Sequence, residues 1–361
     1  MLFRNTLVNW YLENCRPLPW RTTNDPYAIW VSEIILQQTR VNQGLAYYHR
    51  FISRFPDIQS LANASEELVL KTWEGLGYYS RARNMHATAR FLVESHNGNF
   101  PEDFKELEKL KGIGKYTAAA IASIAFNKPV AVVDGNVLRF VSRYLGISQP
   151  IDSGKTINNI SSHVNELISA DSPGLFNQAM MEFGALQCVP VKPDCNKCPF
   201  ANDCKAYKEE KVAVIPYKEK KTGVTARFFN YLVVQHYFND FPGIVLRHRN
   251  HGDIWKHLYD FPLIETNKLL SIDQLRSHDE FMKLFDGSDP VTDVYPGSYR
   301  HLLTHRIIHA RFFKILLGKN DSLRLPDGYI STNNPTHFPM PVLIKKFIEE
   351  QDLKTLLNLM P

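Results

Sequence analysis

The sequence has few cysteines outside one short stretch, and it has no long apolar run. Of the five cysteines in 361 residues, four lie between Cys188 and Cys204, whereas a secreted protein would be expected to spread an even number of them as cross-links. No apolar run approaches the roughly 20 residues that cross a bilayer. Residues 1–20 mix charged and apolar side chains instead of forming an export signal. We therefore expect a soluble protein of a reducing, cytoplasmic compartment with no membrane partner.

The length of the chain predicts more than one domain, because a single core usually stops growing at roughly 250–300 residues. The formal net charge of +5 is mild. It permits a polyanionic partner without demonstrating one, since the sum does not show whether the positive charges cluster.

The pattern of apolar and turn residues changes near residue 205. Before it, SEELVLKTWEGLG (65–77) and PEDFKELEKLKGIG (101–114) begin with a capping residue or proline, carry acids in the first turn and stop at glycine, which predicts helices. The charged stretch 205–224 suits a connector. After it, RFFNYLVVQHY, GIVLRH and ARFFKILLG are β-branched and aromatic runs between turn residues, which predict a second domain with a sheet.

The four clustered cysteines have a distinctive spacing. The gaps between Cys188, Cys195, Cys198 and Cys204 are six, two and five residues. A structural zinc site usually pairs two short hooks some distance apart, whereas these unequal gaps wrap one compact loop around a single object. Four thiolates in a reducing compartment favour a 4Fe-4S cluster, with zinc as the alternative. Cys15 stands alone and is expected to be a small buried apolar residue.

This spacing resembles the cluster loop of the endonuclease III and MutY superfamily of DNA repair glycosylases. The resemblance implies an all-helical HhH-GPD domain with one structural 4Fe-4S cluster, and a basic cluster loop that contacts DNA. Lys192, Lys197 and Lys205 fit that contact, although they also suit a solvated loop.

The segment LKGIGKYTAAAIASIAF places Gly112 and Gly114 between two expected helices. Two glycines let the backbone approach a ligand, and free N–H groups at the next helix start suit a phosphate. Alone this is weak evidence, but the segment resembles the superfamily's helix-hairpin-helix, which positions a protein on DNA without reading its sequence. Members that also cut the backbone carry a lysine where Tyr116 stands here. The resemblance implies a monofunctional glycosylase, with weak lyase activity from Lys115 left open.

Two acids are candidates for catalysis. Asp134, in VAVVDGNVLRF, resembles the catalytic aspartate of the superfamily, and it equally suits an N-cap of the following helix. These roles are compatible, because a capping carboxylate stays ionised and can stabilise the sugar cation left when a base departs. Asn136 could orient the Asp134 carboxylate. If YAIWVSEIILQQTR is helical, Glu33 lies on a largely apolar face, where desolvation raises its pKa unless it reaches water. VSEIILQQT resembles the MutY signature, whose glutamate protonates adenine at N7.

A base inside a duplex must be flipped out before it is cut, and an apolar wedge should fill the gap. Leu76 and Tyr78, followed by Arg81 and Arg83, suit a wedge with phosphate contacts, although a Tyr-Tyr pair more often packs under a helix end. The segment resembles the MutY wedge. By the same resemblance, the residues beside the opposing base are Gln38 and Thr39, and those of the adenine pocket are Arg16, Trp30 and Glu182.

The part after the connector resembles the MutT-like (Nudix-like) α/β domain of MutY, which inspects 8-oxoguanine. WKHLYDFPLIE looks like its core segment, but no Arg-Glu…Glu-Glu run follows to bind the metal of a nucleotide hydrolase. The resemblance therefore implies recognition without hydrolysis. Leu303, Thr304 and His305 stand where the family has a Phe-Ser-His loop. Thr304 retains the hydroxyl of the family's serine, whereas Leu303 lacks the ring of its phenylalanine. The alternative interpretation of this segment is a surface turn without function.

Together these features predict three regions. They are a glycosylase domain at 1–206, with a six-helix barrel at about 22–130 nested in a cluster subdomain of 1–21 plus 131–206, then a connector at 207–226 and a MutT-like domain at 227–361. The chain is identified as a member of the MutY family. This implies a monomeric, nucleoid-associated base excision repair enzyme that removes adenine mispaired with 8-oxoguanine or guanine in double-stranded DNA. The alternatives are an endonuclease III-like glycosylase and lyase for oxidised pyrimidines, and a non-catalytic DNA-binding or electron-transfer iron-sulfur protein.

Overall fold

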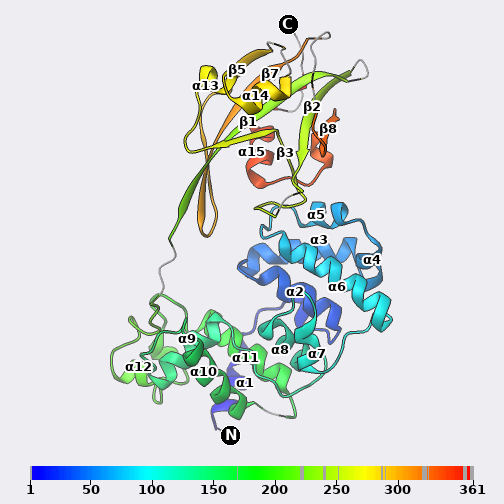
Figure 1. The fold of residues 1–361 in the computed structure, drawn as a ribbon. Helices are drawn as coiled ribbons and strands as arrows, with labels where there is room; N and C mark the ends of the chain where they lie inside the picture. Colours follow the sequence, from blue (N-terminus) through cyan, green and yellow to red (C-terminus); the bar gives the residue numbers. More distant parts are fainter. Residues whose placement is uncertain are drawn as a thin grey trace. The chain divides into compact units, whose positions relative to one another are not determined.

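The computed structural model describes residues 2–357 except 169, 220–222, 239–240, 251, 286–287, 289, 319–322, 324 and 353–355. Contacts among the described residues divide the chain into two compact units, Met1–Asn63 with Asn84–Lys221 and Ala64–Arg83 with Thr222–Pro361 (Figure 1). We call them the helical unit and the sheet unit. Every helix among the described residues is too short or too polar to cross a membrane.

The helical unit contains helices that begin at capping residues, as the sequence predicts. Asp103, for example, accepts hydrogen bonds from the backbone N–H groups of Lys105 and Glu106 at 2.8 and 3.1 Å, which satisfies donors that a helix start leaves free. The elements are α1 (Leu2–Asn14), η1 (Pro19–Arg21), α2 (Pro26–Leu36), α3 (Val41–Arg54), α4 (Ile58–Asn63), α6 (Ser80–His96, which starts in the sheet unit), α7 (Phe104–Lys109), α8 (Lys115–Ile124), α9 (Gly135–Leu145), α10 (Gly154–Leu167), α11 (Pro173–Leu186), η2 (Cys195–Lys197) and α12 (Lys205–Lys208).

Helix α2 is buried on almost every side. Asp25 caps it and Pro26 opens it, and the residues from Ile29 to Ile35 are all buried. The helix packs against α3 and α8. It therefore forms the interior of this part of the unit, and its polar residues Ser32 and Glu33 are buried with it.

A second core joins α1, α9, α10 and α11. Phe140, Phe176, Phe183 and Phe200 are buried in it, and partly buried Cys188 and Cys198 pack against it. Helix α9 begins at the N-cap Asp134 and stops at Gly146, whose φ of 67° is favoured by glycine. The cysteine stretch is thus packed onto an aromatic core beside α9.

In the sheet unit, the described strands form one mixed eight-stranded sheet. Strands β1 and β7 pair in parallel at its centre, and the path runs β3-β2-β1-β7-β5, with β4 on β1, β6 on β7 and β8 on β2. The elements are α5 (Glu66–Trp73), β1 (Thr225–Phe238), β2 (Phe241–His248), β3 (Tyr259–Asp260), β4 (Leu263–Thr266), α13 (Ile272–Arg276), α14 (Asp279–Phe285), β5 (Val291–Val294), β6 (Tyr299–Leu302), β7 (Arg306–Leu316), β8 (Tyr329–Thr332), η3 (Pro335–His337) and α15 (Val342–Gln351).

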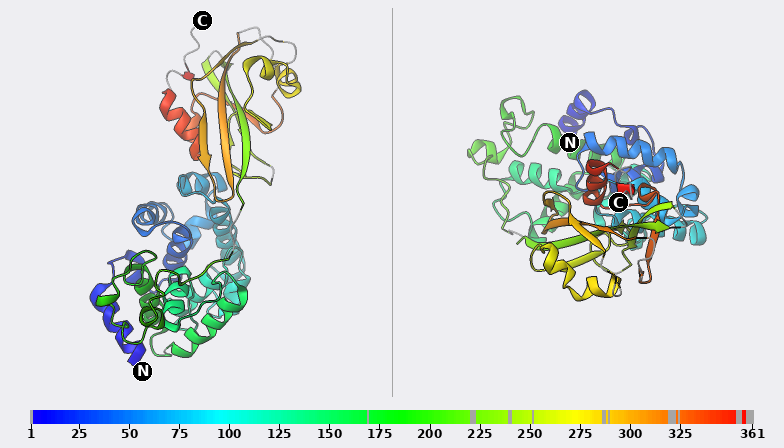
Figure 2. Two further views of the ribbon diagram at one scale, coloured as in Figure 1. Left: turned by 90° about the vertical axis from the view of Figure 1, so that its left-hand side faces the viewer. Right: turned by 90° about the horizontal axis from the view of Figure 1, so that it is seen from above.

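The two-residue alternation of β1 explains why helices cover both faces of the sheet. Phe229, Tyr231 and Val233 lie in one core with α15, whereas Leu232 and Val234 lie in another with α13 and α14. Successive strand residues point to opposite faces, so a continuous apolar run needs cover on each side (Figure 2).

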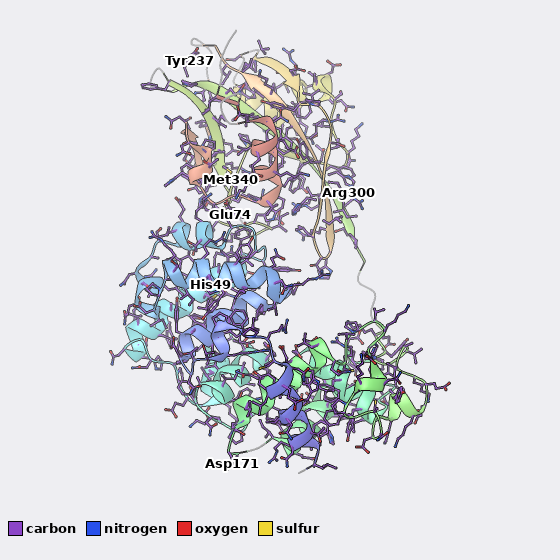
Figure 3. The ribbon with its side chains drawn as sticks, turned by 180° about the vertical axis from the view of Figure 1, so that it is seen from behind. His49, Glu74, Asp171, Tyr237, Arg300 and Met340 are labelled. Atoms are coloured by element: carbon purple, nitrogen blue, oxygen red, sulfur yellow. The ribbon has the colours of Figure 1, made fainter. Side chains whose placement is uncertain are left out.

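Residues 64–83 cluster with the sheet unit, although the sequence predicts a helical domain at 1–206 that includes them. The reason is that α5 and the turn after it carry polar side chains that bond to the backbone between β3 and α15. Figure 3 shows Glu74 beside Met340, whose backbone N–H donates to the Glu74 carboxylate at 3.0 Å. The predicted connector continues into β1 at Thr225, and its residues 220–222 lie outside the described part.

Candidate active site

A cavity of about 490 Å³ opens within the helical unit, a size that suits a small organic group. It is lined by residues from η1, α2, α8, α9, α11 and the segments beside them. Of the residues predicted from sequence, the lining includes Arg16, Glu33, Gln38, Thr39, Tyr116, Asp134, Asn136 and Glu182. The fold thus gathers predicted residues that lie far apart in the chain around the same space.

Glu33 is the buried acid of this cavity. Its side chain comes from α2 and is 6 % exposed, and burial, with a smaller contribution from the negative charge of Asp134, raises its pKa to about 7. A hydrogen bond from the Tyr116 hydroxyl and the positive charge of Arg21 act in the opposite direction. The predicted helix and the predicted desolvation are confirmed. A carboxyl group with this pKa can hold a proton at neutral pH and donate it.

Asp134 lies in the same cavity but accepts several hydrogen bonds. The backbone N–H groups of Asn136 and Val137 donate to it at 2.9 and 2.7 Å, and the Asn136 amide donates at 2.7 Å. Burial raises its pKa, and these donors oppose that shift by favouring the anion. Arg139 in turn donates to the Asn136 side chain and to the carbonyl of Cys188. The N-cap is confirmed, and the carboxylate has a fixed orientation.

Tyr116 occupies the first turn of α8, and its hydroxyl reaches Glu33. Burial and the charges of Glu33 and Asp134 raise its pKa well above the ordinary value, so the phenol stays neutral. The side chain therefore places a neutral hydroxyl, and no amine, beside Glu33.

Glu182 is paired with two arginines. The carboxylate accepts from Arg16 at 2.9 and 2.5 Å, and from Arg21 at 2.8 and 2.7 Å. Burial acts to raise its pKa, but the bonds from Arg21 and Arg16 lower it to about 2. Glu182 is therefore a permanent anion here. Arg21 is not among the residues predicted from sequence; the available signal was its place in the short turn Pro19–Arg21, a few residues after Arg16.

Trp30 is not placed at the cavity. Its side chain is 1 % exposed and packs edge-on against Tyr27 and Phe100 at ring distances of 6.3 and 5.3 Å. Trp20 lines the cavity instead. The residues of α2 that line the cavity are Ile29, Ser32, Glu33 and Leu36, which share one face of the helix, and Trp30 lies outside that face.

The hairpin before α8 has the geometry expected of close backbone approach. Gly112 has a φ of 80°, and a Cβ there would lie 2.6 Å from the Cβ of Asn84. Gly114 caps α8 with open space around it, and Lys115 is exposed beside it. The predicted phosphate contact at this helix start stays a prediction.

Two segments that are distant in sequence meet in the sheet unit. Tyr78 is 46 % exposed, and its hydroxyl forms a short hydrogen bond with the Thr304 hydroxyl. Thr304 and His305 are exposed between β6 and β7, while Leu303 is half-buried against the core and Leu76 is half-buried in its turn. The predicted wedge and the predicted lesion loop therefore share a surface.

Arg81 and Arg83 hold backbone groups. Arg81 donates to the carbonyls of Leu76 and Gly77 at 3.4 and 3.3 Å, and burial lowers its pKa to about 10. Arg83 donates to the carbonyl of Lys256 at 2.7 Å. The phosphate contacts predicted from sequence for these two residues stay predictions.

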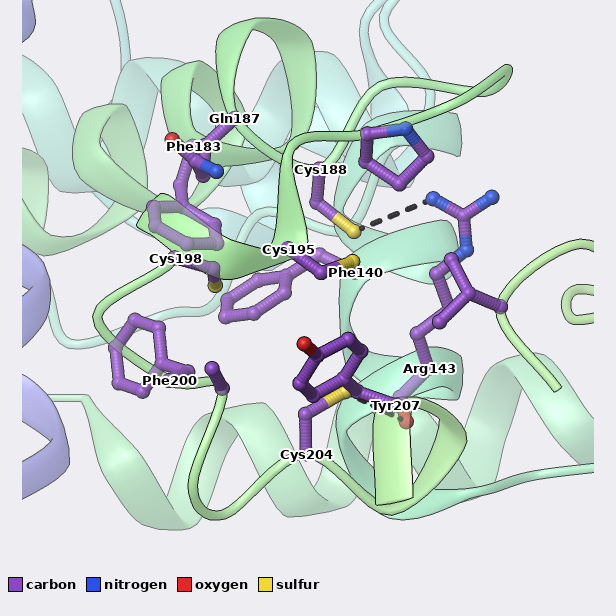
Figure 4. A pocket seen from close by; sticks show the side chains of 13 residues that line it. Phe140, Arg143, Phe183, Gln187, Cys188, Cys195, Cys198, Phe200, Cys204 and Tyr207 are labelled. Carbon is purple, nitrogen blue, oxygen red and sulfur yellow. Dashed lines mark hydrogen bonds between the residues drawn. The ribbon is translucent and has the colours of Figure 1, made fainter. Parts of the chain in front are cut away.

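The four clustered cysteines line a common cavity (Figure 4). Arg143 donates to the Cys188 sulfur at 3.4 Å and to the Val189 and Pro190 carbonyls at 2.7 and 3.0 Å. Within the described residues, no three His, Cys, Asp or Glu side chains are placed to hold a single metal ion. Four thiols are a donor set that can bind zinc or an iron-sulfur cluster. The other walls are Phe140, Phe183, Gln187, Pro193, Phe200, Ala201, Tyr207 and Val212.

Comparisons with known proteins agree with the helical fold described above. Residues 31–166 match the HhH-GPD superfamily of base excision DNA repair proteins. The structure of a thermostable thymine-DNA glycosylase superposes with a TM-score of 0.52 and 29 % identity, over 58 % of this chain and 96 % of that one. The fold and the cavity thus define a base excision repair glycosylase, a hydrolase of N-glycosyl bonds, and they confirm the predicted helical HhH-GPD domain followed by an α/β domain.

The chain belongs to the adenine DNA glycosylase family. It is 34 % identical over 359 residues to the adenine DNA glycosylase of Buchnera aphidicola subsp. Baizongia pistaciae, which covers 96 % of both chains. It is also 43 % identical over 214 residues to the adenine DNA glycosylase of Mus musculus, over 57 % of this chain and 42 % of that one.

Proposed function

We propose that this chain is a monomeric, monofunctional glycosylase that flips adenine out of double-stranded DNA and excises it when the opposing base is 8-oxoguanine or guanine. Such a substrate would place the working enzyme on the nucleoid. The names of its relatives support adenine as the base. The observation that carries the chemistry is a buried, protonatable Glu33 in the same cavity as the hydrogen-bonded carboxylate of Asp134.

Each carboxyl has a distinct role in this proposal. Neutral Glu33 gives its proton to a ring nitrogen of the flipped adenine, which makes the base a better leaving group. As the bond between C1′ and the base breaks, anionic Asp134 stabilises the positive charge that develops on the sugar. Water then adds to the sugar carbon. Tyr116 supplies no amine to attack the sugar, so the product is an abasic site with an intact strand.

The test is single-turnover base release from duplexes that differ at one pair: 8-oxoguanine with adenine, guanine with adenine, guanine with thymine, and guanine with thymine glycol. Fastest release of adenine opposite 8-oxoguanine, with strand cutting only after alkali, is expected. Release of thymine glycol with spontaneous cutting would favour an endonuclease III-like enzyme instead. No release from any duplex would favour a non-catalytic protein.

We also propose that Cys188, Cys195, Cys198 and Cys204 hold a structural 4Fe-4S cluster. The common cavity that the four cysteines line and its aromatic walls support this proposal. When bound, the group would cross-link the end of α11 to the loop of residues 195–204. Iron and acid-labile sulfide in equal amounts are expected in the purified protein, and zinc without sulfide would contradict the proposal.

The rate of adenine release is expected to fall as pH rises through about 7. The raised pKa of Glu33 leaves it mostly protonated below that pH and mostly ionised above it. Each further pH unit then lowers the protonated fraction, and with it the single-turnover rate, about tenfold. A wild-type rate that stays constant across this range would remove Glu33 from the acid role.

Replacing both Thr304 and His305 with alanine is expected to narrow the preference for 8-oxoguanine over guanine. Both side chains are exposed on a turn beside Tyr78, so their loss should affect lesion contact more than folding. The ratio of single-turnover rates on the two duplexes measures this. An unchanged ratio would remove the lesion-reading role from the loop.

A further inference from the structure

Residues 64–83 belong to the sheet unit, and hydrogen bonds join them to the rest of that unit at several points. The Lys71 ammonium donates to the carbonyl of Phe338 at 3.1 Å, and Arg83 donates to the carbonyl of Lys256. Glu66 also bonds to the imidazole of His257. These contacts fix both ends of a segment that carries the turn with Leu76 and Tyr78.

Glu74 is the charged group at the centre of this anchorage. Its side chain is 7 % exposed. The carboxylate accepts from the Met340 N–H at 3.0 Å, from Lys71 at 3.1 and 3.2 Å and from Lys345 at 3.4 Å. The carbonyl of Met340 accepts from the Tyr79 hydroxyl at 3.2 Å. Residues on either side of the turn thus bind the two backbone groups of Met340, just before α15 begins (Figure 3).

The turn between these anchors has an unusual backbone. Gly75, Gly77 and Tyr78 have φ values of 98°, 70° and 47°, and such a φ is sparsely populated for a residue with a side chain. The indole N–H of Trp73 donates to the carbonyl of Gly77 at 3.1 Å. A backbone of this kind persists when its surroundings hold it, which indicates that the position of Tyr78 depends on its anchors.

Helix α15 connects this anchor to the strand that follows the Thr304 loop. Phe347 of α15 stacks on Phe312 of β7 at a ring distance of 3.9 Å. Strand β7 starts at Arg306, directly after Thr304 and His305. Met340 and Leu303, the residue before Thr304, therefore belong to the same packed core. The Tyr78 hydroxyl bonds to the Thr304 hydroxyl beside it.

We propose that Glu74 is a positioning residue that fixes the Leu76–Tyr78 turn to the start of α15, so that Tyr78 and Thr304 form one surface for the base opposite the excised adenine. This inference rests on the proposed function. It assigns the discrimination between 8-oxoguanine and guanine to a carboxylate that touches neither base. Loss of Glu74 leaves Thr304 in place but releases Tyr78 from it.

The experiment uses the full chain and measures equilibrium binding, at one fixed salt concentration, to duplexes with 2′-fluoro-2′-deoxyadenosine opposite 8-oxoguanine or guanine. The variants are Glu74→Ala, Glu74→Gln, Thr304→Ala and the double variant Glu74→Ala with Thr304→Ala. Glu94→Ala is the matched control, because Glu94 is 66 % exposed and pairs with Arg90 at 3.8 Å elsewhere. Adenine release by the wild type is measured in parallel, so that failure of the proposed function is seen separately.

Glu74→Ala is expected to lower the wild-type affinity ratio between the two duplexes by roughly tenfold, about the size of one lost specific contact. Glu74→Gln, which keeps an oxygen for the Met340 N–H, should fall between it and the wild type. The double variant should show no lower ratio than Thr304→Ala alone, since the two residues act through one surface. The proposal would be overturned if Glu74→Ala left the affinity ratio unchanged, for example by lowering the affinity for both duplexes equally. Additive effects of Glu74→Ala and Thr304→Ala on the ratio would overturn it as well. Should Glu74→Ala fail to fold, the ratio of Glu74→Gln decides.

Discussion

Glu33→Gln is expected to reduce the single-turnover rate of adenine release by about 10²–10⁴-fold, the usual contribution of a positioned general acid. The amide keeps the size of the side chain but has no acidic proton to give. DNA affinity should stay close to that of the wild type, because Glu33 is 6 % exposed and contributes no surface charge. Rates on the 8-oxoguanine–adenine duplex, with binding measured at the same salt concentration, test this. Near wild-type release would exclude Glu33 as the acid.

The same variant provides its own folding control. The pKa of Glu33 is raised from 4.5 to about 7 in the folded protein, so the folded state holds this proton more tightly than the unfolded state. Stability is therefore lost as pH rises from about 4.5 through 7, by up to about 3 kcal/mol. Glutamine does not ionise, and the Tm of Glu33→Gln above pH 7 should equal or exceed that of the wild type. A lower Tm would mean that the activity loss reflects damage to the fold.

Asp134→Asn is expected to lower the rate of base release by about 10²–10³-fold, as the loss of one preorganised electrostatic group typically does. The amide oxygen can still cap α9, but the negative charge opposite the sugar is gone. Its nitrogen would also face the donating amide of Asn136.

The matched control for this change is Asp103→Asn. Asp103 caps α7 with the same kind of backbone hydrogen bonds but lies outside the cavity lining. It should lose similar stability and keep its activity. Equal activity losses in the two variants would assign the effect of Asp134 to capping.

The features that could be predicted from sequence depend on local rules. Capping residues mark helix starts, and the apolar surroundings of Glu33 follow from helical spacing. The spacing of the cysteines likewise predicts that their side chains surround a common space, as they do. Each inference needs a few neighbours along the chain and little knowledge of the tertiary fold.

The features that could not be predicted depend on which surfaces meet. Arg21 reaches Glu182 because the tertiary fold brings the two side chains within hydrogen-bonding distance, and no sequence pattern relates two residues 161 positions apart. Trp30 is absent from the cavity lining because it lies off the face of α2 that carries Ile29, Ser32, Glu33 and Leu36, and the apolar pattern of a helix buried on almost every side does not single that face out. The bonds from Arg81 to the carbonyls of Leu76 and Gly77 likewise depend on the conformation of the turn, which the sequence does not specify.

The division of the chain also bears on how the protein can be cut. The chain passes between the two units three times, after Asn63, after Arg83 and at residues 221–222. Cleavage in the stretch before β1 therefore breaks only one of these three connections. A fragment ending there would keep residues 64–83 but lose Met340, Phe338 and Lys256, the backbone partners of Glu74, Lys71 and Arg83. When the chain is cut but both pieces are present, these contacts should hold the pieces together. A chain shortened to its first two hundred residues, by contrast, would contain residues 64–83 without these partners.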